Sequence, residues 1–239
     1  MRTLDLLGAV ELTMSAAIVV AGVALAIGND STQRFRSSAV LAGWFVIVAI
    51  LAATRALHDE HGIGSPGVGL AVALPMALMW LALMRVPSLR QGLDQFPLAM
   101  LVAVHAVRVL GANFLLLQAS HRLPAPFAPV AGWGDIVAGI SAIPVAWLVF
   151  HQGRGWRTML IAWNLFGLAD LVAAVTLGVL SSPGPLRRIF AEPGAGIMST
   201  LPWLLIPGFL VPLLATIHLA IFYRLANPAS VPQPNRPTT

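Results

Sequence analysis

Seven long apolar stretches follow one another along the 239 residues, and they constrain the fold more than any other feature. A helix of about 20 residues crosses the roughly 30 Å hydrocarbon layer of a bilayer, and lipid offers no partners for unpaired backbone groups. The stretches also lack the polar alternation of strands in an outer-membrane barrel. We therefore predict an all-α transmembrane bundle of about seven helices, at residues 6–27, 39–57, 68–84, 96–118, 132–150, 158–180 and 200–223.

The composition agrees with a chain that spends almost its whole length in lipid. Apolar residues make up 58%, charged residues 10%, and the mean hydropathy is +0.84. Soluble domains are about half apolar and a quarter charged. Since no stretch remains that could build a separate soluble core, we predict one transmembrane domain over residues 1–226. The proline-rich, polar residues 227–239 are predicted to form a disordered tail.

Two residue types are absent from the sequence, lysine and cysteine. Without lysine, no Schiff base with retinal or pyridoxal phosphate can form, which excludes a photoreceptor of the lysine-retinal kind. Without cysteine, disulfides, thiolate metal sites and cysteine-anchored iron-sulfur clusters are excluded. The net charge of +5 therefore comes from arginine, and in a membrane protein it is a topology signal. No nucleic-acid partner is expected; the lipid bilayer is the expected environment.

The arginines are distributed unevenly between the two sides of the predicted bundle. Eight lie in the first, third and fifth loops and the C-terminal tail, and five lie on the opposite side. Cytoplasmic loops carry the excess of basic residues, so the N-terminus is predicted outside and the C-terminus in the cytoplasm. The first stretch contains a sequence similar to a signal-peptidase site at residues 24–26. The residues before it lack the basic region of a signal peptide, because the acidic Asp5 and Glu11 offset the positive charge of Arg2. A first transmembrane helix is favoured over a cleaved signal peptide.

Arg108 lies near the middle of the fourth apolar stretch and stays protonated at any accessible pH. An ionised group at that depth is costly unless a partner receives it. Counting about 1.5 Å per helical residue places Asp170 level with Arg108, with Asp135 and Glu11 slightly nearer the outer side. We therefore predict an ion pair of Arg108 with Asp170 or Asp135 in the outer half of the bundle, with Glu11 within reach.

Three further polar side chains are predicted within the membrane. Counting residues from the inner end of each helix places Asn164 and His218 in a layer nearer the cytoplasm, about 9 Å from that boundary. His105 is placed one helical turn farther from the cytoplasm. His105 and Arg108 share a helix face at i, i+3 spacing. Two histidines on separate membrane helices are suitable axial ligands for a b-type haem, whereas a lone intramembrane histidine more often bonds to a neighbouring helix. No cofactor is expected on balance, and haem b at His105 and His218 stays a minor alternative.

The remaining motifs point to no reaction. Residues 58–61 have the order His-Asp-Glu-His, which contains metal-ligand types but not the helical HExxH arrangement, so a solvated loop without metal is favoured. No nucleophile elbow, phosphate-binding loop or dinucleotide fingerprint is present in a suitable context, and an enzyme is not favoured. Prolines at 202, 207 and 212 should kink or break the last helix unless its neighbours compensate.

Four segments of the C-terminal half carry a resemblance to a known family: GWGDIVAGISA at 132–142, WNLFGLADL at 163–171, SPGPLR at 182–187, and the proline-rich stretch 201–218. Together they resemble a bacterial family of polytopic membrane proteins without an assigned function. The resemblance implies a multi-pass protein of the bacterial inner (cytoplasmic) membrane. It implies no activity and no catalytic residue.

The leading hypothesis is an integral membrane protein that binds or conducts a small solute or protons. Its outward-opening polar cavity would be lined by Arg108, Asp135, Asp170 and Glu11. One alternative is a non-enzymatic assembly or structural subunit that docks a membrane protein partner, and another is an electron-transfer protein with haem b. A buried ion pair can equally fix helix register and orientation without any chemistry.

Overall fold

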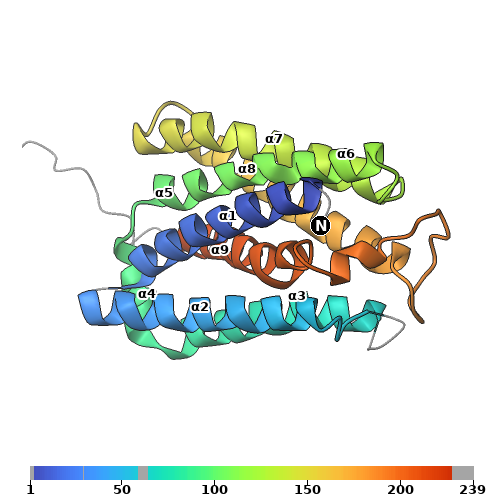
Figure 1. The fold of residues 1–239 in the computed structure, drawn as a ribbon. Coiled ribbons are helices and arrows are strands. Elements are labelled where there is room, and N and C mark those ends of the chain that lie inside the picture. Colours follow the sequence, from blue (N-terminus) through green and yellow to red (C-terminus); the bar gives the residue numbers. More distant parts are fainter. Residues whose placement is uncertain (1–2, 29, 59–63, 228–239) are drawn as a thin grey trace, which may run out of the picture.

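The computed structural model describes residues 3–28, 30–58 and 64–227, and all regular structure in these ranges is helical (Figure 1). Seven helical segments are long and apolar enough to cross a membrane, as predicted. They are α1 (Thr3–Ile27), α2 (Ser31–Ala53), α3 (Ser65–Arg85), the run Leu98–Ala119, α7 (Phe127–Phe150), α8 (Trp156–Ser181) and the run Ile206–Ala226. The predicted tail beyond residue 227 and the loop residues 59–61 lie outside the described ranges.

Several helix ends differ from the predicted ones. Helix α2 covers 31–53 rather than 39–57. It begins early because the Asp30 side chain accepts a hydrogen bond of 2.7 Å from the Gln33 N–H, which caps the first turn. Helix α7 begins at Phe127 rather than at residue 132, without a side-chain cap, because the apolar residues 127–131 also belong to the helix. Hydropathy therefore predicted the position of each apolar span more accurately than the first and last residues of its helix.

The fourth span is helical throughout but is not a single α-helix. It consists of α5 (Leu98–Ala103), the 3₁₀ helix η1 (Val104–Gly111) and α6 (Ala112–Ala119). A 3₁₀ helix has three residues per turn, so side chains at i, i+3 and i+6 lie in one line. The buried residues of η1 are His105, Arg108 and Gly111, which are spaced in this way. The altered winding thus aims the histidine and the arginine at the same side of the bundle.

The seventh span is irregular at its beginning, as its prolines predicted. Residues 201–204 form turns, the π-helix η3 covers Ile206–Leu210, and α9 covers Val211–Ala226. Pro207 lies within η3 and Pro212 lies at the start of α9. A proline has no N–H to donate, which Pro212 tolerates because it lies in the first turn of α9, where the N–H groups have no partner within the helix.

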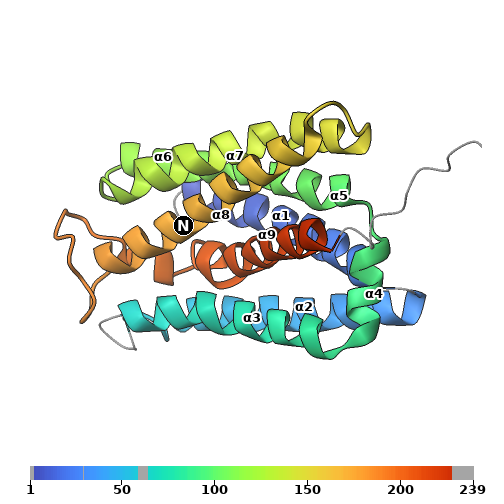
Figure 2. The same cartoon turned by 180° about the vertical axis from the view of Figure 1, so that it is seen from behind.

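The helices form three layers, which Figures 1 and 2 show from opposite sides. Helices α2 and α3 make one outer layer, α1 and α9 the middle layer, and the fourth span with α7 and α8 the other outer layer. The seventh span, η3 with α9, lies at the centre, since about 72% of its apolar part is buried inside the protein, compared with 17% for α2.

The short helix α4 (Pro87–Gln95) lies across one end of the bundle (Figure 2). This end of the bundle is called the α4 end below. Four helices terminate there, namely α1, α3, α7 and α9, and three begin there, namely α2, α5 and α8. Arg224 of α9 is buried and donates hydrogen bonds to the carbonyls of Leu93, at 2.9 Å, and Phe96. This side chain therefore fixes α4 and the turn after it to the central helix.

The opposite end carries the long segment 182–200, which contains the 3₁₀ helix η2 (Gly196–Ser199). Asp5 of α1 pairs with Arg122 at 2.7 Å and accepts a hydrogen bond of 3.0 Å from the Trp203 indole N–H. His58 Nδ1 and Ser199 Oγ lie 2.9 Å apart. These contacts join α1, the turn before α7 and the start of the seventh span.

Candidate functional site

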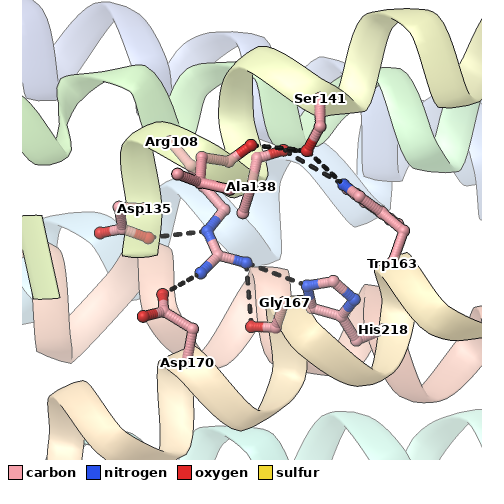
Figure 3. A network of polar contacts seen from close by, with 9 residues as sticks. Arg108, Asp135, Ala138, Ser141, Trp163, Gly167, Asp170 and His218 are labelled. Carbon is pink, nitrogen blue, oxygen red and sulfur yellow. Dashed lines mark hydrogen bonds and ion pairs between the residues drawn. The ribbon is translucent and has the colours of Figure 1, made fainter. Parts of the chain in front are cut away.

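Arg108 extends from η1 into the space between α7 and α8, where two carboxylates receive it (Figure 3). Its Nε donates to Asp135 Oδ1 at 2.7 Å, and its Nη2 donates to Asp170 Oδ2 at 2.6 Å. The arginine is only 3% exposed. An ion pair with one aspartate or the other was predicted, and the structure forms both.

The third nitrogen of the guanidinium connects Arg108 to a carbonyl and a histidine. Nη1 donates to the Gly167 carbonyl at 3.0 Å and lies 3.1 Å from His218 Nε2. A guanidinium is only a donor, so Nε2 must accept and the imidazole proton must be on Nδ1. That proton is donated to Asn164 Oδ1 at 2.6 Å, while Asn164 Nδ2 donates to the His218 carbonyl at 3.0 Å. His218 is therefore a neutral imidazole with a defined tautomer.

The prediction that Asn164 and His218 form a layer separate from Arg108 is wrong. His218 contacts Arg108 directly, and Asn164 bonds to His218. The predicted depth assumed ideal α-helices, but the fourth span contains eight residues of 3₁₀ helix. The seventh span also begins at 206 instead of 200 and ends at 226 instead of 223. A 3₁₀ helix rises about 2.0 Å per residue rather than 1.5 Å, so counted depths shift relative to one another.

His105 lies one 3₁₀ turn before Arg108 and is fully buried. Its ring packs against His218 with ring centroids 4.0 Å apart and meets Trp163 edge to face at 5.3 Å. Neither ring nitrogen has a hydrogen-bond partner within the described ranges. Buried polar groups are usually partnered, so this unpaired imidazole requires an explanation.

The geometry of the two histidines does not fit axial haem ligation. A bis-histidine haem places its macrocycle between the two imidazoles, whereas here the His105 and His218 rings pack directly on each other. Among the residues that the structure describes, no group of three or more His, Asp or Glu side chains is arranged to hold a metal ion either.

Several glycines allow the helix backbones to approach the cluster closely, and two of them, in α7 and α8, meet its polar side chains. A Cβ at Gly134 of α7 would overlap the Asp170 carboxylate. A Cβ at Gly167 of α8 would lie 2.6 Å from His218 Cε1 and 3.0 Å from Arg108 Nη1. Sequence reasoning missed both positions, although Gly134 directly precedes Asp135 and Gly167 lies three residues before Asp170.

Trp163 forms a wall of the cluster and joins two helices (Figure 3). Its indole N–H lies 3.0 Å from Ser141 Oγ and 3.3 Å from the Ala138 carbonyl of α7. The ring also packs against His218, with centroids 5.4 Å apart. Trp163 had been assigned no role from the sequence, because a tryptophan in an apolar helix gives no signal that separates a cluster wall from a lipid-facing residue.

Glu11 takes no direct part in the cluster. It accepts a hydrogen bond of 2.9 Å from Asn113 Nδ2, a residue that sequence reasoning did not select. The next residue, Leu12, helps to line a cavity of about 30 Å³ that adjoins Arg108 and Asp135 between η1 and η3. A cavity of this volume is large enough for a water molecule, and the two charged side chains supply polar partners for it.

Comparison with known proteins gives a family but no activity. A family model described as "Domain of unknown function (DUF8737)" matches residues 65–226, about two thirds of the chain. The matched region contains Arg108, both aspartates, Asn164 and His218. Searches of curated proteins and of solved structures found no match. The chain belongs to this family of unknown function.

Proposed function

We propose that this member of a family without an assigned function is a multi-pass membrane protein that takes up and releases one proton at the Arg108 cluster. Through that exchange it would conduct protons, or move a small solute together with them. The observation that carries the proposal is the charge of the cluster. Two buried carboxylates face a single guanidinium, so one negative charge is in excess when both are ionised.

An unbalanced charge near the middle of a bilayer is expensive. Burying a single unpaired ion costs several kcal/mol even after relaxation. Uptake of one proton by Asp135 or Asp170 makes the cluster neutral and removes this cost. Arg108 itself stays charged, so the aspartates are the groups that exchange the proton, and the adjacent water-sized cavity is a route for it.

Protons fit this site better than an anionic solute does. Four of the five N–H groups of Arg108 already have acceptors, in Asp135, Asp170, Gly167 and His218. An anion would have to displace one of these partners, and the adjoining cavity of about 30 Å³ is too small for most solutes. The arrangement therefore supports a proton as the species exchanged at Arg108.

The proposal also includes a location in the bacterial inner membrane with the α4 end in the cytoplasm. Outside the cluster, arginines at the α4 end outnumber those at the opposite end within the described ranges, which is the distribution expected of a cytoplasmic side. The α4-end residues are Arg34, Arg36, Arg85, Arg90, Arg154, Arg157 and Arg224, and the opposite ones are Arg55, Arg122, Arg187 and Arg188.

Proton flux into proteoliposomes tests the function. A pH-sensitive dye inside the vesicles should report acidification when a potassium gradient and valinomycin set an inside-negative potential. We expect Asp135→Asn and Asp170→Asn to abolish this flux. Glu192→Gln, which removes an acid from the segment 182–200 where its side chain is exposed, should leave the flux unchanged.

Flux at the wild-type rate in both folded aspartate variants would contradict the proposal. The cluster would then serve to fix helix register, as expected of a structural or assembly subunit. Such a subunit should instead co-purify with a stoichiometric membrane protein partner after extraction in mild detergent.

A further inference from the structure

A cavity of about 550 Å³ lies at the α4 end, apart from the Arg108 cluster. Residues of α1, α2, α3, α4, α5 and α9 line it, and no member of the cluster is among them. Its volume is within the range of about 300–1,000 Å³ that is typical of sites for small molecules. The cavity therefore requires an account separate from proton exchange.

The lining of this cavity is amphipathic along the depth of the membrane. Polar residues come almost entirely from the beginnings of α2 and α4, at the boundary of the bundle, and include Gln33, Arg36 and Ser88. The apolar wall extends along α9 from Ala220 to Leu213, a distance of about 10 Å for seven helical residues. The cavity thus has a polar mouth at the membrane surface and an apolar interior.

Arg36 supplies a free positive charge at this mouth. It is exposed, and in the part of the chain that the structure describes it has no hydrogen bond or ion pair. The neighbouring Arg34 and Arg90 differ, because they donate to the carbonyls of Gly28 and Met84, each at 3.1 Å. The lining also contains one carboxylate, that of Asp30, which caps α2 by accepting the Gln33 N–H.

We propose that this cavity binds an anionic membrane lipid, with one acyl chain in the apolar interior and the head-group phosphate at Arg36. The surrounding bilayer supplies such a molecule at high local concentration, and basic side chains at the membrane surface attract anionic head groups. The chain's own residues 228–239 are a poor match for the apolar wall, because they are mostly proline and polar residues. This inference is independent of the proton proposal.

Lipid binding can be measured on the full chain reconstituted in vesicles of phosphatidylcholine. Trace amounts of spin-labelled phosphatidylglycerol or phosphatidylcholine then report the immobilised fraction at a specific site. We expect one tightly held lipid per wild-type chain, with phosphatidylglycerol preferred. Arg36→Gln should reduce this preference about fivefold, the effect of one basic residue near a membrane surface. Arg154→Gln, an exposed arginine at the same end that does not line the cavity, should not.

A substitution that fills the cavity provides a second test of lipid binding. Ala82→Phe places a ring inside the cavity and should weaken binding at least about tenfold, the scale of an overpacking penalty. Ala77→Phe is the matched control, because this alanine is exposed on the same helix outside the cavity. Wild-type immobilisation in Ala82→Phe, equal preference for the two lipids in the wild type, or equal effects of Arg36→Gln and Arg154→Gln would overturn the proposal. A second protein chain held at the cavity in place of lipid would overturn it too.

Discussion

Arg108 and His218 show how acceptors from the protein itself can satisfy a buried cation. Arg108 can only donate, so each of its neighbours must present an acceptor, including the neutral Nε2 of His218. His105 differs, since it contacts the same ring but offers both nitrogens to no partner among the described residues. We therefore expect His218 to stabilise the fold and the unpaired imidazole of His105 to destabilise it, although the two rings are in contact.

Replacing each histidine by phenylalanine tests this contrast. His218→Phe removes the acceptor of Arg108 and the partner of Asn164, and should lower the free energy of unfolding by about 1–3 kcal/mol. His105→Phe keeps an aromatic ring in the stack and removes two unpaired polar atoms, so stability should be unchanged or higher. Thermal unfolding in detergent measures both. Equal destabilisation by the two substitutions would show that His105 has a partner as His218 does.

At this scale the sequence predicted the charges but not their full environment. Arg108 and the two aspartates could be predicted because an arginine in an apolar helix has to find acids on other helices. His218 was placed too near the membrane surface, in a layer apart from Arg108, because counting residues assumes ideal α-helices. Gly134 and Gly167 could not be selected, since their importance comes from a close approach that only the packed helices reveal.

Among the elements, the 3₁₀ helix η1 and the π-helix η3 are the two departures from regular α-helix that border the cluster. Such segments are frequent at functional sites because they turn side chains out of the normal helical register. Prolines predicted the irregular start of the seventh span. No residue of η1 predicted the 3₁₀ winding.

The tight packing of α8 gives a prediction at the element scale. Gly167→Ala should force His218 and Arg108 away from α8 and cost about 1–3 kcal/mol, as overpacking of a core does. Gly43→Ala in α2 is the matched control, because a Cβ there meets nothing within 4 Å. That control should be neutral or gain up to about 1 kcal/mol from helix propensity. Unfolding midpoints that rank the two variants in the reverse order would refute the packing argument.

The whole molecule has its two described ends at opposite faces, as seven spans require. All seven spans were predicted because 20-residue apolar stretches have few alternatives to transmembrane helices. The three-layer arrangement, with α9 in the centre, could not be predicted, because nearly uniform hydrophobicity does not distinguish a lipid-facing helix face from a protein-facing one. The cavity at the α4 end was missed for the same reason.

The orientation in the membrane gives a prediction for the whole molecule. Because the sequence contains no cysteine, a single introduced cysteine is the only thiol that a labelling reagent can modify. Gln152→Cys lies at the α4 end and His121→Cys at the opposite end, and both positions are exposed. A membrane-impermeant maleimide should label His121→Cys in intact cells and Gln152→Cys only after permeabilisation. The reverse pattern would place the α4 end outside.

The central claim is that the cluster of Arg108, Asp135 and Asp170 holds one exchangeable proton, and infrared spectroscopy of the protein in membranes detects it most directly. A cluster made neutral by that proton contains a buried protonated carboxyl group, with a C=O band that shifts in deuterium oxide. The account predicts this band in the wild type and its loss in both Asp135→Asn and Asp170→Asn, because either single variant already balances the arginine. A wild-type protein without the band at any pH at which it stays folded, or a band that persists in both variants, would contradict the account.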